Sequence, residues 1–233
     1  MGDVAVVAGV GAGLGWALAR RFAREGMTVL AAARNLGKLE ALHAADPVPG
    51  IVPMACDVAD ADAVATLFAA AADKGTVRLA VHNAAAFTVK PVADLDPAQV
   101  QREWQVVCLG GFHVAQQAVR RMQPEGRGTI LFTGATAALR GGANFAAFAI
   151  SKFGLRALAQ SLAREVGPQG IHVAHVIVDG LIKGERSDGF GGDKGPDGRL
   201  DPDAIADAYW SLHTQHRSAW TQELDLRPWS ERF

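Results

Sequence analysis

The sequence of 233 residues contains two cysteines and a single tyrosine. Cys56 and Cys108 are too few for a disulfide framework and too isolated for a metal cluster, so we expect both thiols to be reduced and buried. The seven histidines show none of the spacings, such as HExxH, that hold zinc. The sequence therefore indicates neither a disulfide-stabilised fold nor a protein-bound metal.

Long apolar runs and an excess of one charge are also missing. No uninterrupted apolar stretch of about 18 residues occurs, and the first residues lack the charged and apolar segments of a signal peptide. The 23 basic and 24 acidic side chains give a net charge of -1, so no overall field favours nucleic acid or an anionic membrane. We expect a cytoplasmic protein that binds a small neutral or anionic ligand.

Short apolar runs alternate with segments of helical length. The runs are VAVVAG, TVLAAA, IVPMAC, VRLAVHN, GTILFTG and IHVAHVIVD. This alternation is typical of a parallel sheet covered by helices on both faces. The predicted helices span Leu14 to Glu25, Leu36 to Ala45, Ala61 to Lys74, Pro97 to Met122, Phe145 to Val166 and Pro202 to His216. We therefore predict one α/β domain over residues 1–233, a Rossmann-like, doubly wound parallel sheet of about seven strands in three α/β/α layers.

Two regions interrupt this alternation. The segment from Gly184 to Arg199 is polar and rich in glycine, which suits either a lid or a surface loop without fixed structure. The tail mixes tryptophans with residues typical of strands, and we predict a last edge strand near Trp220 to Leu226.

A glycine-rich turn follows the first predicted strand. In AGVGAGLG, Gly9, Gly13 and Gly15 have the spacing GxxxGxG. Glycine allows the chain to turn sharply, brings the backbone close to a pyrophosphate and lets the next helix pack tightly on the strand. The helix that begins near Leu14 then directs its N-terminal amides at the phosphates. We interpret this turn as a dinucleotide site; the alternative is a turn with a structural role only.

The end of the second strand indicates which dinucleotide is bound. An acidic residue there would bind the ribose 2′-hydroxyl, but the sequence has Ala33 and Arg34. Arg34 suits a 2′-phosphate, which a carboxylate would repel, so we expect NADP(H) to be preferred over NAD(H). The alternative is that Arg34 only starts the next helix.

Three further motifs carry a resemblance to a known family: CDVAD after the third strand, HNAA after the fourth, and Lys152 in the helix after the fifth. With the glycine turn, they resemble the short-chain dehydrogenase/reductase family over nearly the whole chain. The resemblance implies cofactor contacts at Asp57 and Val58, at Asn83, at Lys152, and at Gly180 after the sixth strand. It also implies a homodimer or homotetramer and an oxidoreductase that moves hydride between nicotinamide and a carbonyl or alcohol carbon.

The sequence departs from the family pattern at the residues that do the chemistry. Four residues before Lys152, where the family tyrosine acts as acid and base, the chain has Phe148. Thirteen residues earlier, at the family serine, is Ala135, and the family asparagine is replaced by Cys108. The variant spacing, seven residues before the lysine, gives Phe145. Since a phenyl ring neither donates nor accepts a proton, ordinary ketone reduction should be slow.

Two functions remain open at this stage. One is an NADP(H)-dependent oxidoreductase with another proton source, for which Thr133, Thr136, His175 and Asp179 are candidates. The other is a protein without catalytic activity that binds the cofactor and acts as a sensor or on a partner. The sequence does not identify the substrate. It indicates only an apolar, aromatic site near Phe87, Trp104, Phe145 and Phe148.

Overall fold

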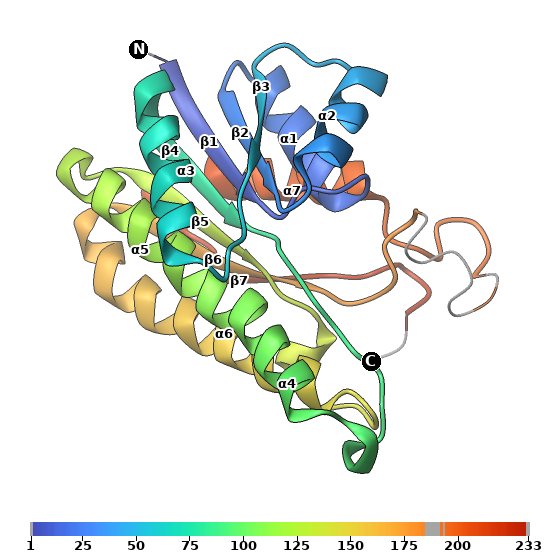
Figure 1. Ribbon diagram of the computed structural model, residues 1–233. Coiled ribbons are helices and arrows are strands. Elements are labelled where there is room, and N and C mark those ends of the chain that lie inside the picture. The colour runs from blue at the N-terminus through green and yellow to red at the C-terminus, as the bar shows by residue number, and fades with distance from the viewer. Residues whose placement is uncertain (1, 185–191, 193, 232–233) are drawn as a thin grey trace.

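The computed structural model describes residues 2–184, 192 and 194–231, and its centre is a parallel sheet. The seven strands have the order β3-β2-β1-β4-β5-β6-β7 (Figure 1). They are β1 (Gly2–Ala8), β2 (Thr28–Ala33), β3 (Ile51–Ala55), β4 (Gly75–His82), β5 (Gly128–Thr133), β6 (Ile171–Val178) and β7 (Glu223–Leu226). The predicted fold class is therefore confirmed.

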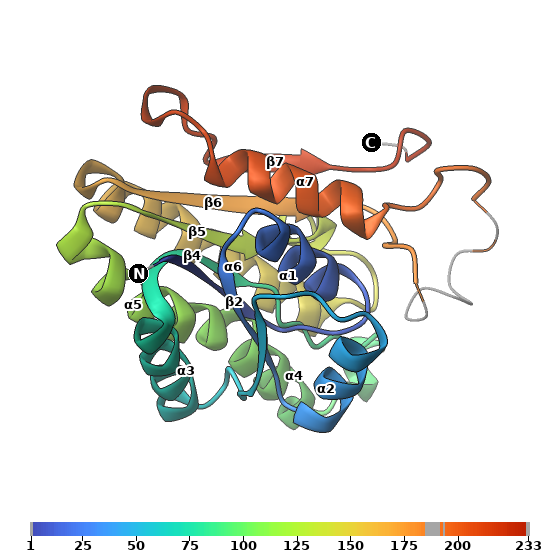
Figure 2. The same cartoon turned by 90° about the horizontal axis from the view of Figure 1, so that it is seen from above.

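Helices cover both faces of the sheet. They are α1 (Leu14–Arg24), α2 (Leu36–Ala45), α3 (Ala61–Lys74), α4 (Pro97–Trp104), α5 (Gly110–Met122), α6 (Ala146–Val166) and α7 (Pro202–His213). Helices α1, α2 and α7 lie on one face, and α3 to α6 on the other (Figure 1). Figure 2 shows α1 and α7 side by side, where Arg20 and Arg21 form ion pairs with Asp203 and Asp207 at 2.6 Å.

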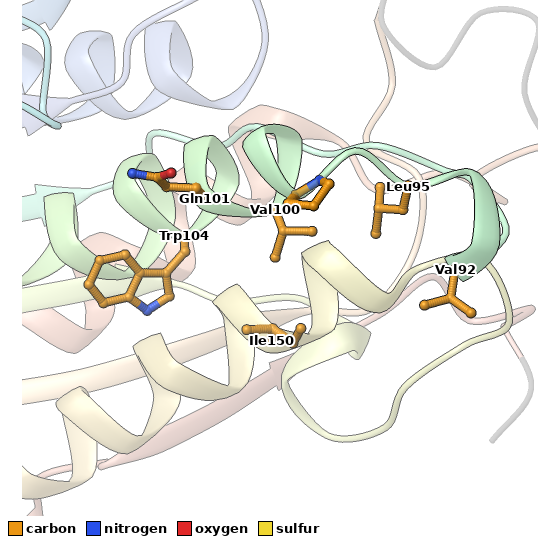
Figure 3. Close-up of a pocket in the computed structure, with 7 residues that line it drawn as sticks. Val92, Leu95, Val100, Gln101, Trp104 and Ile150 are labelled. Carbon is orange, nitrogen blue, oxygen red and sulfur yellow. The ribbon is translucent and has the colours of Figure 1, made fainter.

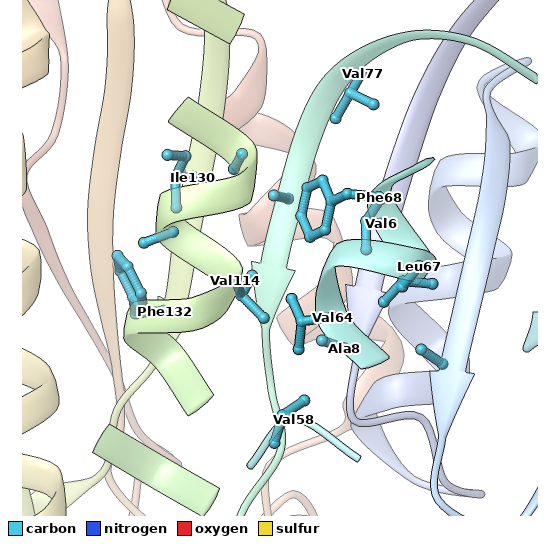
Figure 4. Close-up of a cluster of buried hydrophobic side chains, with 14 of the residues drawn as sticks. Val6, Ala8, Val58, Val64, Leu67, Phe68, Val77, Val114, Ile130 and Phe132 are labelled. Atoms are coloured by element: carbon cyan, nitrogen blue, oxygen red, sulfur yellow. The ribbon is translucent and has the colours of Figure 1, made fainter. Parts of the chain in front are cut away.

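The strands form because their apolar residues are buried on both faces of the sheet. Residues 4–8 of β1 are fully buried, as a central parallel strand requires. On the α3 and α5 side, Val6, Phe68 and Val114 belong to one core cluster with Ile130 (Figure 4). This packing fixes the carboxyl ends of β1, β4 and β5 relative to one another, and the candidate site lies at those ends.

The helix predicted over Pro97 to Met122 contains a π-helical turn at Gln105–Leu109, which separates α4 from α5. Such turns place one extra residue in a helix and are frequent at functional sites. Two other elements were predicted to be longer than the structure shows. The last helix ends at His213 instead of His216, and the edge strand starts at Glu223 instead of Trp220.

The segment predicted to be a lid is described only in part, because residues 185–191 and 193 lie outside the described residues. Its two ends are joined by backbone hydrogen bonds, from the Lys183 amide to the Leu200 carbonyl at 2.8 Å and from the Leu200 amide to the Leu181 carbonyl at 2.9 Å. The two ends of the segment are therefore held next to each other. Within the described part of the chain, no helix has the length and apolarity needed to cross a bilayer.

Candidate cofactor and substrate site

The order of strands changes direction between β1 and β4, and the candidate site lies at the carboxyl ends of these strands. Gly9 follows β1 with a φ of 104°, in the left-handed region that favours glycine. A Cβ on Gly9 would lie 2.2 Å from the Ala84 nitrogen, and one on Gly15 would lie 2.6 Å from the Gly9 carbonyl oxygen. Two of the three predicted glycines are therefore required by close backbone packing.

Asn83 holds the two strand ends together. Its backbone amide donates to the Ala8 carbonyl at 2.8 Å, and its Nδ2 donates to the Gly9 carbonyl, also at 2.8 Å. A shorter or apolar side chain would leave the Gly9 carbonyl without this partner. The structure thus gives Asn83 a role in shaping the glycine turn.

The third glycine lies in open space. A Cβ on Gly13 would meet no atom within 4 Å, and Gly13 caps α1 without any side-chain hydrogen bond. Among the described residues, the backbone amides of residues 11–15, which include Leu14, donate to no partner. No acidic residue occupies the first turn of α1. Unpartnered amides at a helix N-terminus fit an anionic group such as a pyrophosphate.

The other predicted nucleotide contacts lie at the ends of β2 and β3. Arg34 is exposed, precedes the Asn35 cap of α2, and forms no hydrogen bond or ion pair with the described residues. Asp57 is exposed and accepts a hydrogen bond from the Ala59 amide at 3.0 Å. Val58 is buried, and its carbonyl accepts a hydrogen bond from His113 Nδ1 at 3.0 Å. Arg34 therefore does not start the helix and remains available to a ligand.

Lys152 lies at the carboxyl end of β5. Its side chain is 3% exposed, and Nζ donates to the Thr133 carbonyl at 2.6 Å. Burial lowers the pKa of Lys152 to about 8, because a buried ammonium loses its hydration. Nζ also lies 5.6 Å from the centre of the Phe148 ring. An ammonium has three donors, so Lys152 keeps two for another oxygen.

Phe148, one turn before Lys152 on α6, is partly buried. Its ring lies 5.7 Å from the ring of Phe87, which is 55% exposed. Ala135 follows β5 in an extended conformation, with φ -163° and ψ 171°. Neither Phe148 nor Ala135 offers a proton, so these residues provide aromatic and apolar surface where the family resemblance implies two hydroxyls.

Cys108 lies in the π-helical turn and is only partly buried, which differs from the predicted buried thiol. A Cβ on Gly154 would lie 2.7 Å from its sulfur, so Cys108 packs closely against α6. The turn has a second anchor, because the fully buried His82 donates from Nε2 to the Val107 carbonyl at 3.0 Å. Burial, with a smaller contribution from the Lys152 charge, lowers the pKa of His82 to about 3, so this imidazole is neutral.

The hydroxyl of Thr133, one of the proposed proton sources, does not belong to this site. It forms a 2.8 Å hydrogen bond with the hydroxyl of Tyr209 on α7, and both side chains are buried. His175 Nδ1 lies 3.2 Å from Glu223, and its ring packs against Gly134, the residue before Ala135. The Thr133 hydroxyl is therefore held against α7, whereas a role of His175 as a proton source remains a prediction.

Thr136 and Asp179 are brought together beside Ala135. The Thr136 hydroxyl donates to Asp179 Oδ1, and Asp179 Oδ2 lies 3.5 Å from Arg227 Nη2. Arg227 also pairs with Asp225. Gly180, the next residue after Asp179, has a φ of 151°, and a Cβ there would lie 2.8 Å from Pro228. Close packing against the chain's own tail therefore explains Gly180, whose predicted cofactor contact remains a prediction.

Sequence reasoning missed His82 and Glu103. His82 was visible only as the first letter of HNAA, and its contact lies 25 residues away in the chain. Glu103, on α4, is 2% exposed, and burial raises the pKa of its carboxyl. Among the described residues, no group of three or more His, Cys, Asp or Glu side chains is placed to hold a metal ion.

Comparison with known proteins identifies the family. A solved short-chain dehydrogenase from Rhodopseudomonas palustris is 38% identical, with a TM-score of 0.85 over 97% of this chain and 99% of that chain. A family model described as enoyl-(acyl carrier protein) reductase matches residues 9–221. This chain belongs to the short-chain dehydrogenase/reductase family. D-erythrulose reductase from Gallus gallus is 33% identical over 74% of this chain and 68% of its own length. A metagenomic short-chain oxidoreductase solved with NADP is 27% identical, with a TM-score of 0.83 over 98% of both chains.

Proposed function

We propose that this protein is an NADP(H)-dependent oxidoreductase, an atypical short-chain dehydrogenase/reductase that acts without the tyrosine and serine of its family. The observation that carries the proposal is the row of unpartnered amides at residues 11–15, beside the turn formed by Gly9 and Asn83. Because amides without partners at a helix N-terminus are costly unless an anion or water binds them, this backbone fits a pyrophosphate. The metagenomic relative solved with NADP supports the same cofactor.

Arg34 supports the preference for NADP(H). Its guanidinium is exposed, has no partner among the described residues, and follows the strand whose end faces the adenosine ribose in this fold. A charge-assisted contact to a 2′-phosphate would give the Arg34 guanidinium a partner. Fluorescence titration with NADPH and NADH tests this step, and equal affinities would remove the NADP assignment.

Different residues of the chain would bind different parts of the cofactor and the hydride acceptor. The amides of residues 11–15 would hold the pyrophosphate, and Asp57 the adenine side of the cofactor. Lys152 would use its two remaining donors to bind the nicotinamide ribose. The cofactor, when bound, supplies the hydride. Phe148 and Ala135 present apolar surface to the hydride acceptor and supply no proton, so the acceptor must need no protein acid or must take a proton from solvent.

The absence of hydroxyls at Phe148 and Ala135 also favours a second function, a cofactor-binding protein without catalytic activity. The two functions differ in one measurement. NADPH consumption in the presence of any acceptor, at a rate that depends on protein concentration, supports the oxidoreductase. Tight NADPH binding with no consumption across carbonyl, alkene and imine acceptors supports the protein without activity.

An exposed apolar face supports the expected homodimer or homotetramer. A groove of about 420 Å³ runs along α4 and α6 (Figure 3). Its lining includes Val92, which precedes α4, and Trp104, the last residue of α4. Ile150 and Trp104, on its two sides, are 54% and 40% exposed, and Phe153 and Phe112 extend the apolar surface with exposures of 43% and 44%. We propose that a second copy covers this face, since apolar surface of this kind marks protein contacts. Light scattering should show an oligomer for the parent and a monomer for Ile150→Glu.

A further inference from the structure

The acceptor side of the site combines three features: no hydroxyl acid, two aromatic rings, and a buried carboxylate. Phe148 and Phe87 form the aromatic pair, with ring centres 5.7 Å apart. Asp179 is 6% exposed and lies at the end of β6, hydrogen-bonded to Thr136, the residue after Ala135. The short helical turn Thr136–Ala138 packs against α6, the helix that carries Phe148. These features lie at one edge of the sheet.

A carboxylate and two aromatic rings at this edge are groups that attract a cationic ligand. Asp179 and Asp225 both lie near the guanidinium of Arg227, and the Lys152 ammonium lies 5.6 Å from the centre of the Phe148 ring. Aromatic ring faces attract cations, and the attraction grows when water is excluded. The Lys152 ammonium is 3% exposed, whereas Phe148 is only partly buried, so a ligand from solvent meets the ring before it meets the ammonium.

The missing acid points to the same ligand. When a carbonyl accepts hydride, its oxygen becomes an alkoxide that needs a proton. Phe148 and Ala135 can neither donate that proton nor form a side-chain hydrogen bond that stabilises the alkoxide. When an iminium accepts hydride, the new C–H bond forms with the hydride electron pair, the C=N π pair becomes a nitrogen lone pair, and the product is a neutral amine. NADPH is oxidised to NADP⁺, and no proton transfer is required.

We propose that the substrate class of this site is an iminium, a carbon–nitrogen double bond carrying a positive charge, held by the Phe87 and Phe148 rings and the Asp179 carboxylate. This inference rests on the proposed oxidoreductase function, from which it takes the hydride donor. It accounts for the phenylalanine and the alanine at residues 148 and 135, since a cationic acceptor needs attraction before hydride transfer and no acid during it.

Binding to the cofactor-free protein tests the proposal without reference to activity. Calorimetry would compare an N-methyl dihydroisoquinolinium salt, whose charge is permanent, with dihydronaphthalene, its neutral analogue. We expect the cation to bind about tenfold or more tightly than the neutral analogue. Asp179→Asn, which still accepts the Thr136 hydrogen bond, should lower the cation affinity about tenfold and leave the neutral analogue unaffected. Asp225→Asn is the matched control, since it removes the other carboxylate beside Arg227, and it should change neither affinity.

Turnover then separates the two proposals. With NADPH bound, the iminium should be reduced at least about 100-fold faster than tetralone, a ketone of similar size, because only the ketone needs the missing acid. Equal rates on iminium and tetralone overturn the substrate class and leave the oxidoreductase standing. Cation binding that neither exceeds that of the neutral analogue nor responds to Asp179→Asn also overturns it. A protein that binds the cation and fails to bind NADPH removes the proposed function and retains the cationic site.

Discussion

Restoring the missing acid should convert this site into a ketone reductase. The perturbation is the double variant Phe148→Tyr with Ala135→Ser. Ala135 is extended and partly exposed, so a serine fits there without backbone strain. Phe148 is only partly buried, so a phenol oxygen at the end of its ring does not have to enter a closed core. The fold should therefore accept both changes.

The size of the effect follows from the position of Lys152. Its Nζ lies 5.6 Å from the Phe148 ring centre, and two unit charges at that separation interact by about 3 kcal/mol at an effective dielectric constant of about 20. This corresponds to roughly two pKa units, so the new phenol should titrate near pH 8 instead of about 10. A general acid tuned in this way contributes about 10²- to 10⁴-fold, and we expect a gain of at least about 100-fold on test ketones with NADPH.

The chain offers clean controls for this experiment. Burial raises the pKa of Tyr209, the only native tyrosine, far above its usual value, so the new phenol is the first to ionise in an absorbance titration. Trp229→Tyr adds a phenol at a residue that is 81% exposed, and it should titrate near 10 and leave activity unchanged. A double variant that binds NADPH like the parent, with a phenol pKa near 10 and no gain on ketones, would refute the reasoning.

Three further predictions follow from the described contacts. Arg34→Ala should weaken NADPH binding by about 1.5 to 3 kcal/mol and leave NADH binding unchanged in a fluorescence titration, with Lys74→Ala at the far end of α3 as control. Gly15→Ala should destabilise the fold by about 1 to 3 kcal/mol in urea, because the new Cβ would lie 2.6 Å from the Gly9 oxygen, whereas Gly11→Ala, with no atom within 4 Å, should have little effect. The pKa of Lys152 is lowered from 10.5 to about 8 in the folded protein. Between pH 8 and pH 10.5 the lysine therefore carries its proton in the unfolded chain but not in the folded one, and the free energy of unfolding should rise with pH in that range. Lys152→Met should abolish that rise, and urea unfolding of both proteins near pH 7 and pH 10 would measure it; an equal pH dependence in the two proteins would contradict the assignment.

The sequence predicts the architecture well because parallel strands need apolar residues on both faces. The runs that became β1 and β6 are continuous and buried throughout their centres, and α2 and α3 have the predicted bounds. The π-helical turn was not predicted, and the hydrogen bond at its centre joins His82 to Val107, which belong to different elements. Likewise, whether Thr133 points to the site or to Tyr209 depends on which face of β5 its side chain occupies. Local sequence patterns do not carry such information.

The candidate site also contains some features that the sequence predicts and others that it does not. The glycine turn is predictable because its requirement is steric: a Cβ at Gly9 or Gly15 would overlap backbone atoms. Lys152 and Asn83 were predicted from a family resemblance, and the structure brings both to the carboxyl edge of the sheet, although their contacts with a cofactor remain predictions. The carboxylate of Asp179 was one of several open alternatives, and it differs from Thr133 and His175 in that its hydrogen-bond partner is Thr136, the residue after Ala135.

The same contacts explain how the chain can lack the family hydroxyls and keep the fold. Ala135 is extended, a conformation that any residue adopts, and the Phe148 ring lies near Phe87 and the Lys152 ammonium. The turn around Cys108 has an anchor of its own in the hydrogen bond from His82. None of Phe148, Ala135 and Cys108, which the family resemblance assigns to the tyrosine, serine and asparagine positions, donates a side-chain hydrogen bond to another element of the described chain. Asn83 is different, because its side chain closes the turn at Gly9. The residue that shapes the cofactor turn therefore also links two strands of the sheet, whereas Phe148, Ala135 and Cys108 do not. These three residues can differ without loss of the fold. The residues present beside Lys152 fit a charged hydride acceptor that needs no acid.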